Sequence, residues 1–219
     1  MFSSESLWIG DNLVELARQT PGFTLLNVGS STGHFRKVEQ AHIDKNIFQR
    51  LQGIATVDHL DLKKADGVDI VGDLTDKSFL QSLKARKYDG VLCSNLLEHV
   101  VNPGEICACM EDCVESGAFS IITVPHRYPY HNDPIDTMFR PDVAGIVAMF
   151  PRSSLVKGEI LDIDQSHFSH MMGNKKQLFT ALVRWVTPFY KFSAWKKLVS
   201  YIPQTFKKYQ VTCVVLRKN

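Results

Sequence analysis

The chain has 219 residues, of which 44% are hydrophobic and 22% charged, a composition ordinary for a folded globular protein. No apolar run approaches the ~18 residues that a membrane-spanning helix needs, and the first residues lack the basic and apolar segments of a signal peptide. This argues against membrane-spanning and secreted classes, so we expect a cytoplasmic protein folded as one domain over residues 1–219.

Charge is distributed unevenly, although the net charge is only +2. No aspartate or glutamate follows Asp164, whereas ten lysines and arginines do, which leaves 15 basic and 23 acidic residues in the preceding part. This asymmetry indicates an anionic partner for the C-terminal part of the chain.

The predicted elements alternate between helix and strand in chain order. Hydrophobic periodicity and turn residues predict helices over 6–18, 75–84, 103–115 (with Gly117 as its C-terminal cap) and 142–150. They predict strands over 24–28, 55–61, 67–73, 88–95, 118–124, 155–163 and 210–216. A broken helix or loop is expected over 34–52, a loop over 125–141, and a basic, mostly helical insertion over about 166–208. This order predicts an α/β fold: a Rossmann-like three-layer sandwich with a mostly parallel sheet, an antiparallel C-terminal strand and the helical insertion.

The first strand ends at a turn of small residues from Gly29 to Gly33. In α/β folds, a strand followed by such a turn and a helix binds nucleotide-like ligands at the carboxyl ends of the strands. Glycine permits close approach of the backbone to a ligand because it has no Cβ. Two other interpretations stay open: a turn that only packs, and a hydrolase elbow with Ser31 as nucleophile.

Two further strands end on acids, Asp61 and Asp73, and Leu96-Leu97-Glu98-His99-Val100 follows the fourth strand. Together with the glycine turn, these features resemble class I S-adenosylmethionine-dependent methyltransferases, particularly the broad type 11 group. The resemblance covers roughly Leu25 to Phe150. It implies methyl transfer from S-adenosylmethionine as the activity and S-adenosylmethionine as the cofactor.

The resemblance also implies a set of cofactor-binding residues. The loop around the methionine end would contain Gly29, Ser31 and Gly33. Asp61 would accept hydrogen bonds from the ribose hydroxyls, with Asp44 as an alternative. The adenine edge would contact Asp73 and the backbone of Leu74, and the pocket would be closed by Asn95 and Leu96.

Two positions depart from the family pattern. Asn27 stands where the family usually has an acid, and Ser31 stands where it usually has a glycine. Both changes can weaken cofactor binding, so a non-catalytic module that binds a partner through the basic insertion stays open as an alternative.

The loop from His126 to Arg140 is dense in polar residues and resembles a subgroup associated with cell-envelope polysaccharide biosynthesis. This implies a hydroxyl or amine of an envelope sugar or related small molecule as the methyl acceptor, with another small metabolite as the alternative. His131 and Asp136 are candidate catalytic residues, because a histidine–aspartate pair can accept the acceptor's proton near neutral pH. The alternative is that they only stabilise the loop against Arg140. His99 is a second candidate base.

No metal site is expected from the cysteines. Cys107 and Cys109 point apart on a helix, only Cys109 and Cys113 share a face, and no CxxC pair exists. We therefore predict buried, reduced thiols.

The insertion carries an apolar and aromatic stripe flanked by lysines over residues 185–208. One interpretation is an amphipathic helix docked on the domain. The other is a surface for weak contact with an anionic glycan or with the anionic inner face of a membrane. A nucleic-acid partner is not expected, because no RNA-binding module is evident.

Overall fold

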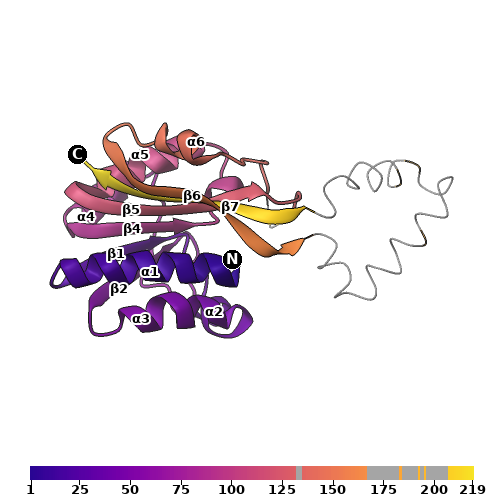
Figure 1. Cartoon of the computed structure of the whole chain (residues 1–219). Coiled ribbons are helices and arrows are strands. Elements are labelled where there is room, and N and C mark those ends of the chain that lie inside the picture. Colours follow the sequence, from indigo (N-terminus) through magenta and orange to yellow (C-terminus); the bar gives the residue numbers. More distant parts are fainter. Residues whose placement is uncertain (132–134, 167–182, 184–191, 193–194, 196–206) are drawn as a thin grey trace. The chain divides into compact units, whose positions relative to one another are not determined.

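The computed structural model describes residues 1–131, 135–166, 183, 192, 195 and 207–219 (Figure 1). The chain divides into two units, residues 1–161 with 211–219 and residues 162–210. Of the insertion expected over 166–208, which contains the stripe of residues 185–208, the structure describes only residues 166, 183, 192, 195, 207 and 208, so the stripe as a whole lies outside the described residues. Within it, Phe192 and Trp195 are helical, and their stacked rings lie 5.8 Å apart.

A seven-stranded sheet has the order β3-β2-β1-β4-β5-β7-β6. Its strands are β1 (Phe23–Val28), β2 (Ala55–Asp61), β3 (Ile70–Val71), β4 (Tyr88–Ser94), β5 (Val114–Arg127), β6 (Ser153–Ser166) and β7 (Lys208–Lys218). The first five strands pair in parallel, and β7 runs in the opposite direction (Figure 1). β1 and β4 are almost entirely buried, as expected of parallel strands covered on both faces.

Helices cover both faces of the sheet (Figure 1). They are α1 (Ser3–Gln19), α2 (Ala41–Ile43), α3 (Gln49–Leu51), α4 (Lys77–Lys84), α5 (Pro103–Cys113) and α6 (Val143–Val147). α1, α2 and α3 lie on one face, whereas α4, α5 and α6 lie on the other. Side-chain caps define three helix starts: Asp76 accepts from Phe79 N (3.0 Å), Asn102 precedes a proline at the first helical position, and Asp142 accepts from Gly145 N (2.8 Å).

The predicted α/β fold is confirmed, and three local predictions are corrected. The strand predicted over 67–73 is only β3, Ile70–Val71, because Gly67 has a positive φ of 75° and belongs to a turn. Gly117 does not cap α5: the helix ends at Cys113, and Gly117 lies inside β5 with φ 89°. β5 therefore begins before, and ends after, the predicted strand 118–124.

The segment predicted as broken helix or loop over 34–52 is a broken helix. Two π-helical turns, Phe35–Glu39 and Asp44–Phe48, alternate with α2 and α3. The five cysteines are free, as predicted, and four are buried, whereas Cys109 is only partly buried. Burial raises the pKa of Cys107 and of Cys113 to about 12. In the part of the chain that the structure describes, no helix combines the length and apolar character needed to cross a membrane.

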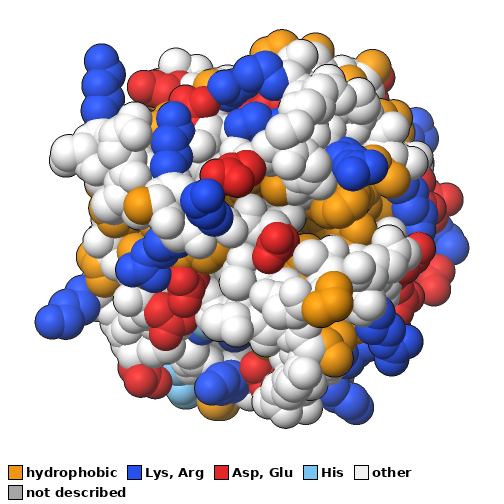
Figure 2. All heavy atoms as spheres, turned by 90° about the vertical axis from the view of Figure 1, so that its left-hand side faces the viewer, with side chains coloured by type: hydrophobic (Ala, Val, Ile, Leu, Met, Phe, Trp, Pro, Cys, Tyr) orange, Lys and Arg blue, Asp and Glu red, His pale blue; other side chains and the backbone are white. Residues whose placement is uncertain are grey.

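Figure 2 views the molecule from the left-hand side of Figure 1, where the parallel strands begin. Basic and acidic side chains are interspersed over this face. Several of them pair near the starts of β4 and β5: Lys87 with Glu115 (3.4 Å) and Arg152 with Asp112 (2.7 Å). The predicted functional residues belong to the opposite, carboxyl edge of the sheet.

Candidate active site

Strands β1, β2 and β4 end at the same level of the sheet. Val28 of β1 aligns with Leu60 of β2 and with Cys93 of β4, so the next residues along each strand, Gly29, Asp61 and Ser94, share the carboxyl edge. Ligands bind at this edge in open α/β sheets. The register therefore brings the predicted glycine turn, the predicted ribose acid and the segment containing Asn95 together.

The turn after β1 is directly connected to Asp61. Ser31 N donates to Asp61 Oδ2 (2.9 Å), and Lys63 N donates to Asp61 Oδ1 (3.1 Å). Ser31 has φ 55°, a left-handed conformation in which a non-glycine residue is strained by about 1 kcal/mol. Ser31 thus takes a backbone conformation that glycine adopts without strain.

Arg36 stabilises this turn from within, and sequence reasoning missed it. Its buried guanidinium donates through Nη1 to the carbonyls of Ser30 and Ser31, both at 2.7 Å, and through Nη2 to the carbonyl of Gly67 at 2.6 Å. The side chain therefore joins the turn after β1 to the connection between β2 and β3.

Close protein neighbours leave no room for a side chain at Gly29, in the turn after β1, or at Gly67, in the connection between β2 and β3. A Cβ on Gly29, which has φ 68°, would lie 2.9 Å from Leu96 Cδ2. A Cβ on Gly67 would lie 2.6 Å from the Cα of Gly33, whose N donates to Asp66 O (2.7 Å). The predicted cofactor residues Gly29 and Leu96 are thus in contact, and Gly33 packs against the connection between β2 and β3.

Asn27 has a partner on the neighbouring strand. Its Nδ2 lies 3.0 Å from His59 Nδ1, and Asn27 itself is buried. Burial, and secondly the charge of Arg36, lower the pKa of His59 from 6.5 to about 4. A neutral His59 can accept the amide hydrogen, so an amide at position 27 suits this neighbour.

The His59 pKa predicts a pH dependence of stability. The unfolded chain binds the His59 proton near pH 6.5 and the folded chain only near pH 4, so stability present above pH 6.5 is lost as the pH falls through this window. We expect His59→Gln, which still offers Asn27 an acceptor, to reduce this loss by about 1–2 kcal/mol after allowing for partial exposure. Urea denaturation at pH 7 and pH 4.5 measures the loss of stability, with His34→Gln, at an exposed histidine, as control. The same pH dependence of stability in wild type and His59→Gln would contradict the prediction.

The side chains of the other two acidic cofactor candidates, Asp73 and Asp44, accept hydrogen bonds from residues close to them in the sequence. Asp73 Oδ1 accepts from the N and Oγ1 of Thr75, both at 2.8 Å, and Leu74 is buried beside it. Asp44 lies in a π-helical turn, where it accepts from Gln49 Nε2 (2.7 Å), and not at a strand end.

Asn95 is tied to helix α1 through a buried acid. Glu5 Oε1 accepts from Asn95 Nδ2 (2.7 Å) and from Thr123 Oγ1 (2.6 Å), while Glu5 Oε2 accepts from Phe2 N (3.1 Å). Asn95 has φ 50°, so its backbone turns sharply after β4. Glu5 was not predicted, because it precedes the helix expected over residues 6–18 and its partners lie far away in the sequence.

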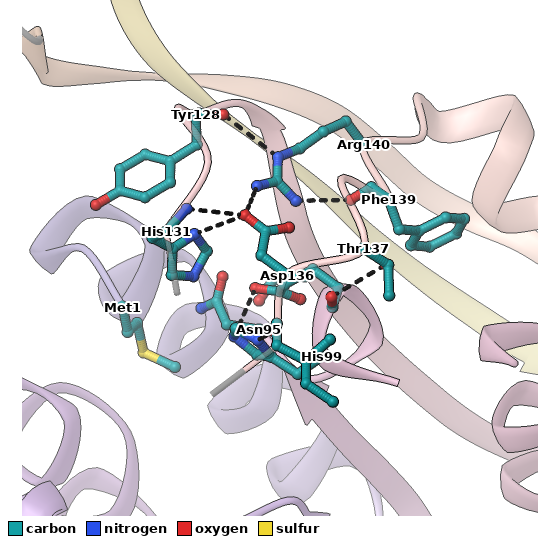
Figure 3. A network of polar contacts seen from close by, with 12 residues as sticks. Met1, Asn95, His99, Tyr128, His131, Asp136, Thr137, Phe139 and Arg140 are labelled. Carbon is teal, nitrogen blue, oxygen red and sulfur yellow. Dashed lines mark hydrogen bonds and ion pairs between the residues drawn. The ribbon is translucent and has the colours of Figure 1, made fainter. Parts of the chain in front are cut away.

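The loop after β5 is organised around Asp136, whose side chain is fully buried. It accepts from His131 N (3.0 Å), Met138 N (2.8 Å) and Arg140 Nη2 (2.6 Å), and Oδ2 also lies 3.0 Å from His131 Nδ1 (Figure 3). Burial acts to raise the pKa of Asp136, but the hydrogen bonds from Arg140 and the backbone outweigh it and lower the pKa to about 2. The geometry thus contains both predicted features, the His131–Asp136 pair and the contact of Asp136 with Arg140.

His131 and His99 are brought together with Glu98. Their rings meet edge to face with centroids 5.1 Å apart, and one ligand atom from each of Glu98, His99 and His131 lies within 4.8 Å of the others. Burial raises the pKa of Glu98 to about 7. Glu98 was not predicted as a site residue.

Solved structures share this architecture over nearly the whole chain. A protein classified as a sarcosine dimethylglycine methyltransferase from Galdieria sulphuraria matches with a TM-score of 0.56 and 11% identity, covering 99% of this chain and 86% of that one. Coclaurine N-methyltransferase, bound to N-methylheliamine and S-adenosylhomocysteine, matches with a TM-score of 0.56 and 14% identity, covering 97% and 70%. The chain has the class I methyltransferase fold.

The likeness is one of fold. A protein classified as a methyltransferase from Bacillus halodurans also matches with a TM-score of 0.56 and 11% identity, covering 95% of this chain and 99% of that one. No family model matches the sequence, and no match was found among curated proteins. Gly29, Asp61 and Asn95 lie at the carboxyl edge of the sheet, where open α/β folds bind ligands. His99 and His131 lie together beside this edge.

Proposed function

We propose that this protein binds S-adenosylmethionine and transfers its methyl group to a small-molecule acceptor. The observation that carries the proposal is the hydrogen bond that Ser31 N donates to Asp61 Oδ2 at the carboxyl edge of the sheet. It joins the glycine turn to the acid at the end of β2 in a fold whose solved members include a methyltransferase bound to S-adenosylhomocysteine.

Each cofactor contact is assigned to a residue of this edge. Asp61 accepts one backbone hydrogen bond on each oxygen, and because a carboxylate has about four acceptor sites, two are left for the ribose hydroxyls. The turn containing Gly29, Ser31 and Gly33 surrounds the methionine end. The adenine edge and the mouth of the pocket are assigned to Asp73, Leu74, Asn95 and Leu96. The cofactor supplies the electrophilic methyl group, and the protein supplies proximity and alignment.

Asp61→Ala is expected to weaken S-adenosylmethionine binding by about 1.5–3 kcal/mol, because two charge-assisted hydrogen bonds to the ribose are lost. Isothermal titration calorimetry measures the change. The matched control is Asp11→Ala, which removes an exposed carboxylate that pairs with Arg50 on the surface. Unchanged affinity in Asp61→Ala would remove Asp61 from the cofactor site.

For the acceptor, we propose a hydroxyl or amine of an envelope sugar or a related small molecule, with another small metabolite as the alternative. Support for the sugar comes from the resemblance of the His126–Arg140 loop. His131 and His99 are the candidate groups for taking the acceptor's proton. Asp136 is buried and accepts three hydrogen bonds, so we assign it the positioning of His131. A non-catalytic module is the competing function, and Ser31, strained at φ 55°, is the feature that favours it.

We further propose a cytoplasmic location with weak contact to the anionic inner face of the membrane through residues 185–208. Because electrostatic attraction is worth about 1 kcal/mol per lysine near such a surface and is screened by salt, binding should fade at high salt. Flotation with anionic vesicles at low and high salt tests this. Replacing Trp195, Lys196 and Lys197 by alanine should abolish low-salt binding; absence of any wild-type binding would contradict the proposal.

A further inference from the structure

We propose that Glu98, His99 and His131 form a binding site for a divalent transition-metal ion beside the proposed methyl-transfer site. The three residues come from two segments, the turn after β4 and the loop after β5. One ligand atom from each lies within 4.8 Å of the other two. The set of one carboxylate and two imidazoles is a recurring ligand set for such ions in proteins.

Glu98 is the first argument for a missing cation. Its side chain is 1% exposed, and Oε2 has no hydrogen-bond partner among the described residues. Oε1 lies 3.8 Å from His99 Nε2, beyond hydrogen-bond distance. A buried carboxylate oxygen without a partner costs free energy unless a ligand compensates it. A cation between Glu98 and the two rings supplies that compensation.

The orientation of the histidines is the second argument. Metal-binding histidines usually direct one ring nitrogen to a carbonyl or carboxylate and coordinate through the other. His99 Nδ1 makes a short contact with the carbonyl of Ile135, and His131 Nδ1 lies 3.0 Å from Asp136 Oδ2 (Figure 3). His131 Nδ1 is buried without a hydrogen bond among the described residues, and Asp136 Oδ2 is the acceptor within hydrogen-bond distance of it. In both rings this leaves Nε2 for a metal ion.

The donor set limits the ion. Imidazole nitrogens favour Zn²⁺ or Fe²⁺ over Mg²⁺ and Ca²⁺, which prefer oxygen ligands, and the carboxylate of Glu98 also suits Mn²⁺. Bonds of about 2.1 Å require ligand atoms about 3–4 Å apart, so small side-chain rotations from the present spacing complete the set. Three protein ligands leave coordination positions open, as in catalytic sites.

The open positions point to an acceptor with an ionisable hydroxyl, an assignment that rests on the proposed function. Coordination lowers the pKa of such a hydroxyl. Because His99 and His131 hold the ion in this arrangement, coordination replaces their proposed role as bases, and the proton passes to solvent. An oxygen lone pair then forms the C–O bond as the C–S bond of the sulfonium breaks. The electron pair of that bond stays on sulfur, which becomes a neutral thioether.

Metal binding is tested on untagged full-length protein stripped with a chelator. Calorimetry with Mn²⁺ and with Zn²⁺ should show one site per chain, and the Co²⁺ absorption spectrum should lack thiolate charge-transfer bands. Glu98→Gln and His131→Ala are each expected to weaken Mn²⁺ binding at least 100-fold, whereas the exposed His34→Ala should bind as wild type does. Far-UV circular dichroism and thermal melting check that each variant is folded, and His131→Gln serves as a second variant should His131→Ala unfold.

The outcomes separate the two proposals. The metal site is overturned if wild type binds no stoichiometric metal ion, or if Glu98→Gln and His131→Gln bind the ion as tightly as wild type does. This holds whatever the cofactor titration shows. Metal binding without S-adenosylmethionine binding supports the metal site and overturns the proposed function instead. Undiminished methyl transfer to a hydroxyl acceptor in chelator-stripped protein overturns the assigned use of the metal.

Discussion

Arg36→Met is expected to lower the free energy of unfolding by about 3–5 kcal/mol. Methionine retains much of the apolar volume but leaves the carbonyls of Ser30 and Gly67 without the Arg36 donor and the carbonyl of Ser31 with only Ser30 Oγ. An unsatisfied buried polar group costs about 1–3 kcal/mol. Urea denaturation of the purified variant measures the loss. We also expect weaker S-adenosylmethionine binding, because the turn that contains Ser31 loses its internal support.

The matched control for this prediction is Arg50→Met. Arg50 donates to Asp11 (2.7 Å) on the surface, where an ion pair contributes about 0–1 kcal/mol. A loss below 1 kcal/mol for Arg36→Met, or a similar loss for both variants, would show that the arginine does not stabilise the turn.

Arg140→Met is expected to lower the free energy of unfolding by about 3–5 kcal/mol, because it leaves the buried carboxylate of Asp136 without the Arg140 cation. Adding Asp136→Asn to this variant should recover part of the loss, since the unpaired charge is then removed. Urea denaturation of the two single variants and the double variant gives the coupling. The exposed Arg18→Met is the control, and a double variant less stable than Arg140→Met would contradict the buried-pair account.

The strands and the carboxyl-edge residues were predictable because their signals are local. Buried parallel strands read as short apolar runs, and the residue that ends each run marks the edge of the sheet. Gly29 and Asp61 were found in this way. β3 was predicted too long because the alternation in residues 67–73 continues through Gly67, whose conformation is set by its packing against Gly33.

Other parts of the site depend on contacts that no local pattern shows. Arg36 acts on the backbone carbonyls of two separate segments, and Glu5 bonds to Asn95, 90 positions away. Glu98 stood inside the segment that carried the family resemblance, but its relation to His131 depends on how the loop after β5 folds back. Such pairings are tertiary, so sequence periodicity and motif spacing do not reveal them.

Titration of the purified chain with S-adenosylmethionine and S-adenosylhomocysteine tests the central claim most directly. We predict saturable binding of one molecule per chain, weakened in Asp61→Ala and retained in Asp11→Ala. Absence of binding to either compound by protein that is folded by circular dichroism, together with tight binding of NAD, would contradict it.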